Sequence, residues 1–324
     1  MGDLVVVGVD GGGTKTDVCV VNDAGTVLGF ATGSGSNWEG IGLDAVGATL
    51  EHLVGCALAE ARVEPAWIAA SAFCLAGIDW PSDRERLTPV LDSLALAGDR
   101  FVDNDSFAAL RSGTATPWGC VSIAGTGGVA AARNPSGATA RTMGIAVGEG
   151  AGAAGLVHAA VSAIAQEHNG SGPATALTER LLAATNTQST AEFFESVMRG
   201  RIHIGGGLAV HVLAVASEGD PVARSIGTQC GAQHGRDTVA VANRVELDGR
   251  FDVVLAGGVH LSGDDSFRSG FRDVVLARYP DAALRVLEAP PVAGAALLAL
   301  DLIGASGAQL HERVVAGTSA ARGA

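Results

Sequence analysis

A short apolar run that breaks into consecutive glycines constrains the start of this chain more than any other feature. Residues 4–9 are apolar apart from one glycine, and the string DGGGTKT at residues 10–16 follows them directly. A run of this kind is typical of a buried strand. Two further strands are expected at residues 16–21 and 26–32, because turn-forming residues separate them. The chain therefore opens as a three-stranded meander, whereas a Rossmann unit would pass from its first glycine turn into a helix.

The opening pattern returns in the middle of the chain. Residues 119–124 are apolar, GTGG fills residues 125–128, and residues 129–133 are largely apolar again. A repeated strand, glycine turn and strand is what two related halves facing each other across a cleft would leave in a sequence. Short loops could also produce the repeat by chance.

Helical spacing of apolar residues and short apolar runs predict the remaining elements. Helices are expected at residues 43–63, 83–94, 106–112, 151–166, 174–184, 191–198, 208–218, 221–243, 264–278 and 292–303, and strands at 67–75, 101–103, 251–256 and 283–287. The Ala- and Gly-rich residues after Leu310 are expected to fray. One domain is predicted to comprise residues 1–112 with 291–324, because the last helix returns to it. The second domain is predicted at residues 113–290, after the point where the glycine-rich pattern restarts.

Composition argues against several classes of protein. The formal net charge is −13 and the sequence has no basic cluster, which argues against a nucleic-acid partner. No apolar run is long enough to span a membrane. The five cysteines form no CxxC pair, and no cysteine has metal-ligand spacing with His203, His211 or His234. We therefore expect reduced thiols, a cytoplasmic location and no structural metal.

The first glycine string has the chemistry of an anion-binding turn. Gly12 and Gly13 let the backbone come close to a ligand, and successive N–H groups can point at one phosphate. Asp10 could hold Mg²⁺ through water, because hard cations prefer oxygen ligands. Thr14 offers a hydroxyl and Lys15 a positive charge. The alternative is an ordinary hairpin turn with a lysine facing solvent.

Two further glycine strings extend this interpretation. Gly125, Thr126 and Gly127 could hold the β- and γ-phosphates of a nucleotide from a second hairpin. Gly257 and Gly258 follow a buried strand and would permit close approach of adenine or ribose. Each string alone is more often just a turn or a junction between elements.

Asp105 is the candidate general base. It stands at the end of a predicted strand and ahead of a predicted helix, where it could accept the proton of an attacking hydroxyl. It could instead cap the helix that begins at Ser106. Asp103 and Asn104 are competing candidates.

In this order, the strings DGGGTKT, AGTGG, LAGGV and PPVAGAALLAL, with an acidic strand end between the first two, resemble the ASKHA superfamily of sugar kinases and actin-like ATPases. The nearest resemblance is to the N-acetylglucosamine kinase branch of the BadF/BadG/BcrA/BcrD-type ATPases. It covers nearly the whole chain. It implies an α/β fold of two ribonuclease H-like domains with a nucleotide cleft between them, with ATP and Mg²⁺ as cofactors.

The resemblance also assigns residues. It matches Asp10 to the Mg²⁺-associated acid, the two hairpins to phosphate loops, Gly257 and Gly258 to the adenosine motif, and Asp105 to the catalytic base. The sugar site would comprise Asp105 and the following residues: Asn37, Gly77, Asp79, Gly144 and Glu149.

The chain departs from the family pattern at three positions near the sugar site. Ala76 stands where the family has a serine, Glu149 where it has an aspartate, and Gly150 where it has a glutamate. Asn37 could be a turn residue instead of a sugar contact, and Glu149 could be an acid near a helix N-terminus.

The function implied is transfer of the γ-phosphoryl group of ATP to a hydroxyl, the 6-OH, of an amino sugar such as N-acetylglucosamine or glucosamine. The resemblance further implies a homodimer. A dehydratase-activating ATPase is the first alternative, but such proteins need clustered cysteines to hold an iron–sulfur cluster. A sugar-sensing protein that kept the fold and lost the chemistry is the second.

Overall fold

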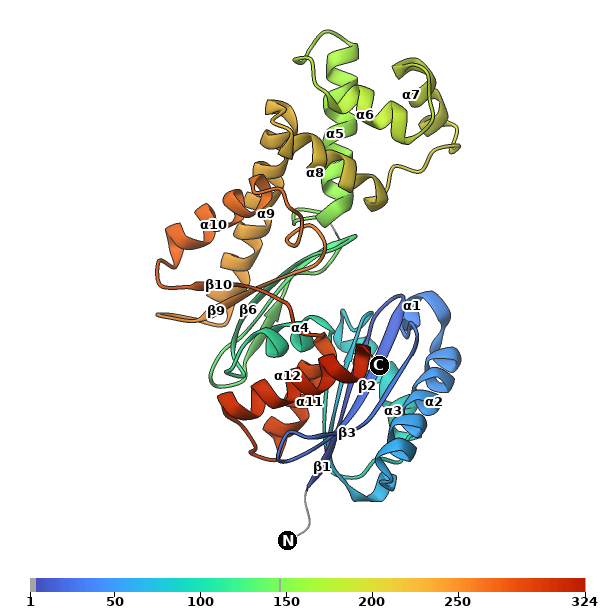
Figure 1. Ribbon diagram of the computed structural model, residues 1–324, viewed down its shortest axis with the longest axis vertical. Coiled ribbons are helices and arrows are strands. Elements are labelled where there is room, and N and C mark those ends of the chain that lie inside the picture. Colours follow the sequence, from blue (N-terminus) through green and yellow to red (C-terminus); the bar gives the residue numbers. More distant parts are fainter. Residues whose placement is uncertain (1–3, 146, 324) are drawn as a thin grey trace. The chain divides into compact units, whose positions relative to one another are not determined.

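The computed structural model describes residues 4–145 and 147–323, and the chain divides into two compact units (Figure 1). Unit 1 comprises Met1–Gly119, Arg133–Gly137 and Leu287–Ala324, and unit 2 comprises Cys120–Ala132 and Ala138–Val286. Each unit contains one five-stranded sheet. The candidate site residues are therefore described within the unit to which they belong.

The sheet of unit 1 is mixed. Its strands are β1 (Val5–Gly11), β2 (Lys15–Asn22), β3 (Val27–Ser34), β4 (Ile68–Leu75) and β5 (Asp99–Asp103), in the spatial order β3-β2-β1-β4-β5. The first three strands form an antiparallel meander, and β1, β4 and β5 run parallel. Because parallel strands end at the same edge, the residues that follow β1, β4 and β5 are brought to one edge of this sheet.

Helices cover both faces of this sheet (Figure 1). They are α1 (Trp38–Ile41), α2 (Leu43–Ala61), α3 (Pro81–Asp92), α4 (Ser106–Gly113), α11 (Pro291–Leu302) and α12 (Ala308–Gly323), with the 3₁₀ turn η1 (Pro65–Trp67). Buried residues of α2 and α3 pack with Val7, Val9, Val18 and Val20 in one core. α11 covers the opposite face, against β1 and β4, and α4 packs on α11.

The sheet of unit 2 repeats this order. Its strands are β6 (Gly119–Ala124), β7 (Gly128–Arg133), β8 (Thr139–Arg141), β9 (Asp252–Ala256) and β10 (Ala283–Val286), in the order β10-β9-β6-β7-β8. Counted from its first strand, each sheet places strands three, two, one, four and five side by side. The repeat predicted from the two glycine strings is therefore confirmed as a repeat of sheet topology.

The helices of unit 2 are α5 (Gly152–His168), α6 (Leu177–Ala184), α7 (Thr190–Met198), α8 (Ala209–Ser217), α9 (Pro221–Arg244) and α10 (Ser266–Arg278), with the 3₁₀ turn η2 (Gly206–Leu208). Figure 1 shows α5 to α8 gathered at the end of this unit away from strands β9 and β10. α9 and α10 pack closely, and α9 also contacts α5 and α8. No helix in the part of the chain that the structure describes is long and apolar enough to cross a membrane.

Most elements predicted from the sequence are confirmed within a few residues, but α1 and β8 were not predicted. The expectation that the chain frays after Leu310 is wrong, because α12 continues to Gly323. Leu310, Val314 and Thr318 lie four residues apart and are buried, which gives α12 a packed face. Alanine and glycine around these residues obscure the pattern in the sequence.

Candidate functional site

The first glycine-rich turn connects β1 and β2 in unit 1. The N–H of Gly12 donates to the carbonyl of Lys15 at 2.8 Å, and the carbonyl of Gly12 accepts from the N–H of Ser36 at 3.0 Å. These bonds fix the base of the turn, while Gly13 and Thr14 at its tip are exposed. The turn is thus held from below and presents its tip to solvent, as a phosphate-binding loop requires.

Charged side chains gather at the base of this turn. The register pairs Asp10 with Asp17, so both side chains lie on the same face of the sheet. Asp17 is buried and lies 2.9 Å from the ammonium of Lys15 and 3.6 Å from Nε of Arg322 on α12. Burial, with the charges of Asp105 and Asp17, raises the pKa of Asp10 to about 8.

This arrangement fits a divalent cation. Carboxylates that repel each other would be stabilised by Mg²⁺, which prefers oxygen ligands. The described residues contain no group of three His, Cys, Asp or Glu side chains that could hold a metal ion by themselves. A cation at this place would need water or phosphate oxygens for most of its ligands.

Asp105 lies between β5 and α4, at the same edge of the sheet as the first turn. The capping alternative for this residue is wrong, since its side chain makes no capping hydrogen bond to the helix. Asn104 does so instead, because its Oδ1 accepts from the N–H of Ser106 at 3.0 Å. Asp103, the other competing candidate, forms an ion pair with Arg84 at 3.1 Å.

Three of the predicted sugar contacts lie together beside Asp105. The Asn37 side chain packs against Gly77, where an added Cβ would lie 2.4 Å from Asn37 Oδ1. Asp79 Oδ1 accepts from Nδ2 of Asn104 at 3.2 Å, so the Asp79 loop is tied to the residue preceding Asp105. The structure thus brings Asn37, Gly77 and Asp79 to the sheet edge that carries Asp105.

Trp38 and Asn37 both serve the local structure as well. Asn37 caps the short helix α1 by accepting from the N–H of Glu39 at 3.0 Å, and Trp38 Nε1 donates to the carbonyl of Gly77 at 2.6 Å. Asn37 is thus a helix cap and not simply a turn residue, and this bond leaves the two Nδ2 hydrogens of its side chain for other acceptors.

The second glycine-rich turn connects β6 and β7 in unit 2. The N–H of Gly125 donates to the carbonyl of Gly127 at 3.0 Å. The first amides of α5 brace the turn, because Ala153 donates to the Gly125 carbonyl at 2.8 Å and Ala154 to the Thr126 carbonyl at 3.1 Å. Thr126 and Gly127 themselves are exposed.

Gly257 and Gly258 follow β9 and lie against the end of β6. A Cβ added to Gly257 would lie 2.4 Å from the carbonyl oxygen of Ala124, and Val259 donates to that same oxygen at 3.0 Å. A glycine is required at position 257 both by this approach and by its backbone φ of 88°. The adenosine-motif candidates thus adjoin the second turn.

A cavity of about 680 Å³ opens beside these residues within unit 2. Gly125, Thr126 and Gly258 line it, together with Gly206, Leu213 and Asp264. Its size and its mixture of apolar walls with a few polar groups suit a small ligand such as a nucleoside. The wall supplied by α8 was not predicted, because an apolar helix face in a sequence usually indicates core.

Glu149 and Gly144 lie in a loop of unit 2 that also contains Ala146, which is outside the described residues. The Glu149 carboxylate accepts from the backbone N–H groups of Met143 and Ile145, so it closes the loop around Gly144. The other sugar candidates belong to unit 1. The interpretation of Glu149 as a helix-end acid is wrong, because α5 begins at Gly152 and its first turn contains no acidic residue.

Sequence reasoning missed two residues of the first site. Asp17 could have been found from the hairpin, because pairing the strands on either side of the turn places Asp17 opposite Asp10. Arg322 gave no such signal, because 305 residues separate it from Asp17 in the chain.

Known proteins share this architecture. The N-acetylmuramic acid/N-acetylglucosamine kinase of Clostridium acetobutylicum is 23% identical over 300 residues, which are 91% of this chain and 97% of that protein. A Chromobacterium violaceum structure, provisionally named an N-acetylglucosamine kinase, aligns with a TM-score of 0.65 at 22% identity over 91% of this chain and 98% of that one. A ROK hexokinase from Thermus thermophilus aligns with a TM-score of 0.56 at 19% identity, over 93% of this chain and 100% of that one.

The structural similarities confirm the predicted fold class, an α/β protein with two domains of the sugar-kinase and actin-like type. The family assignment follows from the sequence itself, which matches the family along residues 7–299. The chain therefore belongs to the BadF/BadG/BcrA/BcrD ATPase family.

Proposed function

We propose that this protein is an ATP-dependent sugar kinase that transfers the γ-phosphoryl group to the 6-OH of an amino sugar, with N-acetylglucosamine as the first substrate to test. The observation that carries the proposal is the position of Asp105. Asn104 caps α4 in its place, and Asp105 stands at one sheet edge with the first glycine-rich turn and the Asn37–Gly77–Asp79 cluster.

Both glycine-rich turns would bind the phosphates of one nucleotide. The first would contribute Gly12, Gly13 and Thr14, and the second Gly125, Thr126 and Gly127. The cavity beside Gly258 would take the adenosine, since it adjoins the second turn. Lys15 would add positive charge near the phosphates while it remains paired with Asp17.

Mg²⁺ held near Asp10 would neutralise the negative charge that develops on the phosphate oxygens during the transfer. Asp10 would bind this ion through water, and the nearby charges of Asp17 and Asp105, which help to raise the pKa of Asp10, would favour a cation there. Each carboxylate would then remain ionised at neutral pH because a cation lies close to it.

Asp105 would accept the proton of the attacking sugar hydroxyl. Asn37, Gly77 and Asp79 would orient the sugar, so that the hydroxyl oxygen approaches the γ-phosphorus in line. The family resemblance, and the names of the relatives, point to an amino sugar and to the 6-OH. The same resemblance suggests a homodimer, which light scattering of the purified protein would test.

A sugar-sensing protein without kinase activity is the second candidate. One observation favours it: Glu149 binds two backbone amides of its own loop, and Gly150 provides no side chain for a sugar contact. The two candidates differ in one measurable respect, because only a kinase converts ATP to ADP when a sugar is added.

The test is a panel of amino sugars and their parent hexoses, with ADP formation and sugar phosphate measured in the presence of Mg²⁺. We expect at least one amino sugar to be phosphorylated. Asp105→Ala should lower kcat by about 10³-fold, the scale of a lost general base, while Mg-ATP binding by calorimetry is retained. Asp92→Ala, on the exposed face of α3, is the matched control and should be active. Near-normal turnover of Asp105→Ala would contradict the assignment.

A further inference from the structure

A buried histidine of α9 lies beneath the second glycine-rich turn and has no part in the chemistry described above. His234 is 1% exposed. A Cβ added to Gly128 would lie 2.2 Å from the carbonyl oxygen of Gly150 and 2.5 Å from Cε1 of His234, and a Cβ added to Gly150 would lie 2.4 Å from Cδ2 of His234. Real Cβ contacts are not this short, so the imidazole occupies the space that a side chain at position 150 would need and, together with the backbone of Gly150, the space that one at position 128 would need.

α9 also holds residues 150–152 by hydrogen bonds. The N–H of Gly152 donates to Nε2 of His234 at 3.2 Å, and the N–H of Gly150 donates to Oδ2 of Asp237 at 2.6 Å. His234 and Asp237 are three residues apart on one helix and therefore share a face. Two acceptors on this face thus fix the backbone of residues 150–152.

Residues 152–154 in turn support the phosphate-binding turn. The backbone of Gly152 is so close to the turn that an added Cβ would lie 2.1 Å from the carbonyl oxygen of Gly127. The next two amides donate to the carbonyls of Gly125 and Thr126. A continuous series of short contacts therefore runs from α9 to the tip of the turn.

We propose that His234 is a positioning residue for the second phosphate-binding turn: its ring supports the turn at Gly128 and holds Gly152, which braces residues 125–127. The proposal rests on the proposed function, because it assumes that this turn binds the phosphates of ATP. Phosphate-binding amides act only if their directions are fixed before the ligand arrives.

The surroundings of His234 keep its ring in the form that can accept a hydrogen bond. Burial lowers the pKa of His234 to about 4, so the ring is neutral at physiological pH. The rings of His260 and Phe267 face it at 6.3 and 5.3 Å between centroids. Asp237 is the acidic residue on its own helix. Since Nε2 accepts from Gly152, the ring proton is assigned to Nδ1.

The contacts also explain the unusual glycine at position 150. The related sequence pattern has a glutamate there, and the His234 ring leaves no room for its Cβ. Histidine at 234 and glycine at 150 are therefore one structural unit in this chain, and a change at either position should be felt at the other.

The first test compares His234→Leu with His234→Gln, using the KM for ATP, the KM for the sugar and kcat. We expect His234→Leu to raise the KM for ATP by about 10-fold, because the brace at Gly152 loses its acceptor, and to change the KM for the sugar by less than about twofold. His234→Gln keeps an acceptor oxygen and should recover part of the loss. Phe271→Leu, which removes buried ring surface from α10, is the control for destabilisation alone.

The inference is overturned if His234→Leu and Phe271→Leu share the same KM for ATP. Calorimetry of the unmodified protein separates this failure from a failure of the proposed function. If the unmodified protein binds Mg-ATP and His234→Leu binds it equally well, only the role of His234 is wrong. If the unmodified protein binds no Mg-ATP, both proposals fall.

A second test does not depend on the stability of His234→Leu. Gly150→Ala alone should raise the KM for ATP, because the new methyl group displaces either the ring or the loop. Gly150→Ala combined with His234→Ala removes the clash and should recover thermal stability relative to Gly150→Ala alone. The lost acceptor should keep the KM for ATP of the double variant high. Independent, additive effects of the two substitutions on stability would contradict the proposed contact.

Discussion

Single glycines set how closely elements approach in unit 1. At Gly8 in β1, an added Cβ would lie 2.2 Å from the backbone nitrogen of Ala296 in α11. At Gly294, two residues earlier in α11, it would lie 1.9 Å from the carbonyl oxygen of Ala108 in α4. α11 therefore comes close to the sheet on one side and to α4 on the other through backbone atoms, which fixes the spacing of α4 from β1.

Gly8→Ala should destabilise the protein by about 1–3 kcal/mol or more, because the obstructing atoms belong to a helix backbone and cannot rotate away. Gly55→Ala is the matched control. Gly55 lies on the exposed face of α2 with no atom within 4 Å of an added Cβ, so that substitution should stabilise by about 0.5–1 kcal/mol. Urea unfolding of both variants measures the two values. Equal midpoints would show that α11 can move away from β1.

The residue scale also shows which side chain binds the first amide of α4. A carboxylate just before a helix is usually consumed by capping. Here Asn104 takes the amide of Ser106, and Asp105, one position on, makes no capping bond. The string Asp103-Asn104-Asp105 thus divides three tasks among adjacent residues: an ion pair with Arg84, a helix cap and the candidate base.

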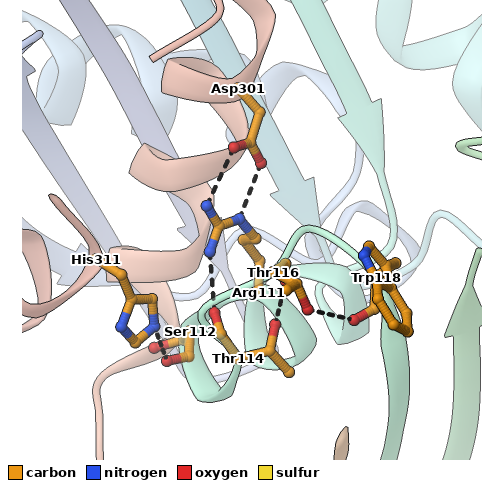
Figure 2. A network of polar contacts seen from close by, with 7 residues as sticks. All are labelled: Arg111, Ser112, Thr114, Thr116, Trp118, Asp301 and His311. Atoms are coloured by element: carbon orange, nitrogen blue, oxygen red, sulfur yellow. Dashed lines mark hydrogen bonds and ion pairs between the residues drawn. The ribbon is translucent and has the colours of Figure 1, made fainter. Parts of the chain in front are cut away.

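Among the elements, α4 is fixed at both ends. Figure 2 shows the polar network at its C-terminal end. Nε and Nη2 of Arg111 donate to the two carboxylate oxygens of Asp301 in α11, at 2.8 and 3.0 Å, and Nη1 donates to the Thr114 carbonyl at 2.9 Å. Ser112 Oγ donates to the carbonyl of Pro290, and His311 of α12 donates to the Ser112 carbonyl, both at 2.9 Å.

This network holds the chain where it leaves α4 and where it enters α11. Residues 114–118 lead from α4 towards β6, and Pro290 precedes the return into α11. A helix of eight residues has little stability of its own, so these tertiary contacts must maintain it. We therefore expect the position of Asp105 to depend on Arg111, although the two side chains are more than one helical turn apart.

Asp301→Ala should cost about 3 kcal/mol of unfolding free energy, because it leaves the guanidinium of Arg111, which is 2% exposed, without its carboxylate. Combining Arg111→Met with Asp301→Leu removes both charges and should recover most of that loss. Chemical denaturation of the two variants and the unmodified protein tests this. A double variant less stable than Asp301→Ala would show that the bonds of Arg111 to the backbone matter more than the ion pair.

For the molecule as a whole, buried histidines couple stability to pH. Burial lowers the pKa of His234 to about 4 and, with the charges of His234 and Arg268, lowers the pKa of His260 to about 3. Both values lie below the ordinary histidine value of 6.5. Between these folded-state values and pH 6.5 the unfolded chain binds protons at the two histidines that the folded protein does not. The contribution of the two histidines to stability is therefore fully present above pH 6.5 and is lost as the pH decreases.

Between pH 7 and pH 5 each of these histidines should remove about 2 kcal/mol from the free energy of unfolding. His260→Phe removes one titrating group from a pocket that Phe267 and Phe271 already line, at ring centroid distances of 5.0 and 5.2 Å. Between pH 7 and pH 5, protonation of buried histidines should therefore cost the variant about half as much stability as it costs the unmodified protein. Denaturation at both pH values gives the difference, and identical pH dependence would show that His260 is not buried in its neutral form.

Much of the fold followed from local pattern. Apolar runs ended by glycines predicted the strands, and helical spacing predicted nearly every helix within a few residues. The two glycine turns and Asp105 also stood out, because each is a run of unusual residues at a strand end. Patterns of this kind are visible in a sequence because the cause and the effect lie within a few residues of each other.

What the sequence could not provide were pairings between distant segments. Arg322 beside Asp17, α8 beside the cavity, Arg111 with Asp301, and His234 under Gly128 and Gly150 all join residues far apart in the chain. The helix after Leu310 was missed for the same reason, because its short buried face is recognisable only once its packing against β3 is known.

The sequence by itself determined the strands, most helices and the turns able to approach an anion, since these depend on backbone sterics and on local apolar periodicity. Only the tertiary structure decided that Asn104 and not Asp105 caps α4, and that a neutral histidine braces the second turn. The first outcome depends on the backbone geometry at the start of α4, and the second on the packing of α9 against a segment far away in the sequence.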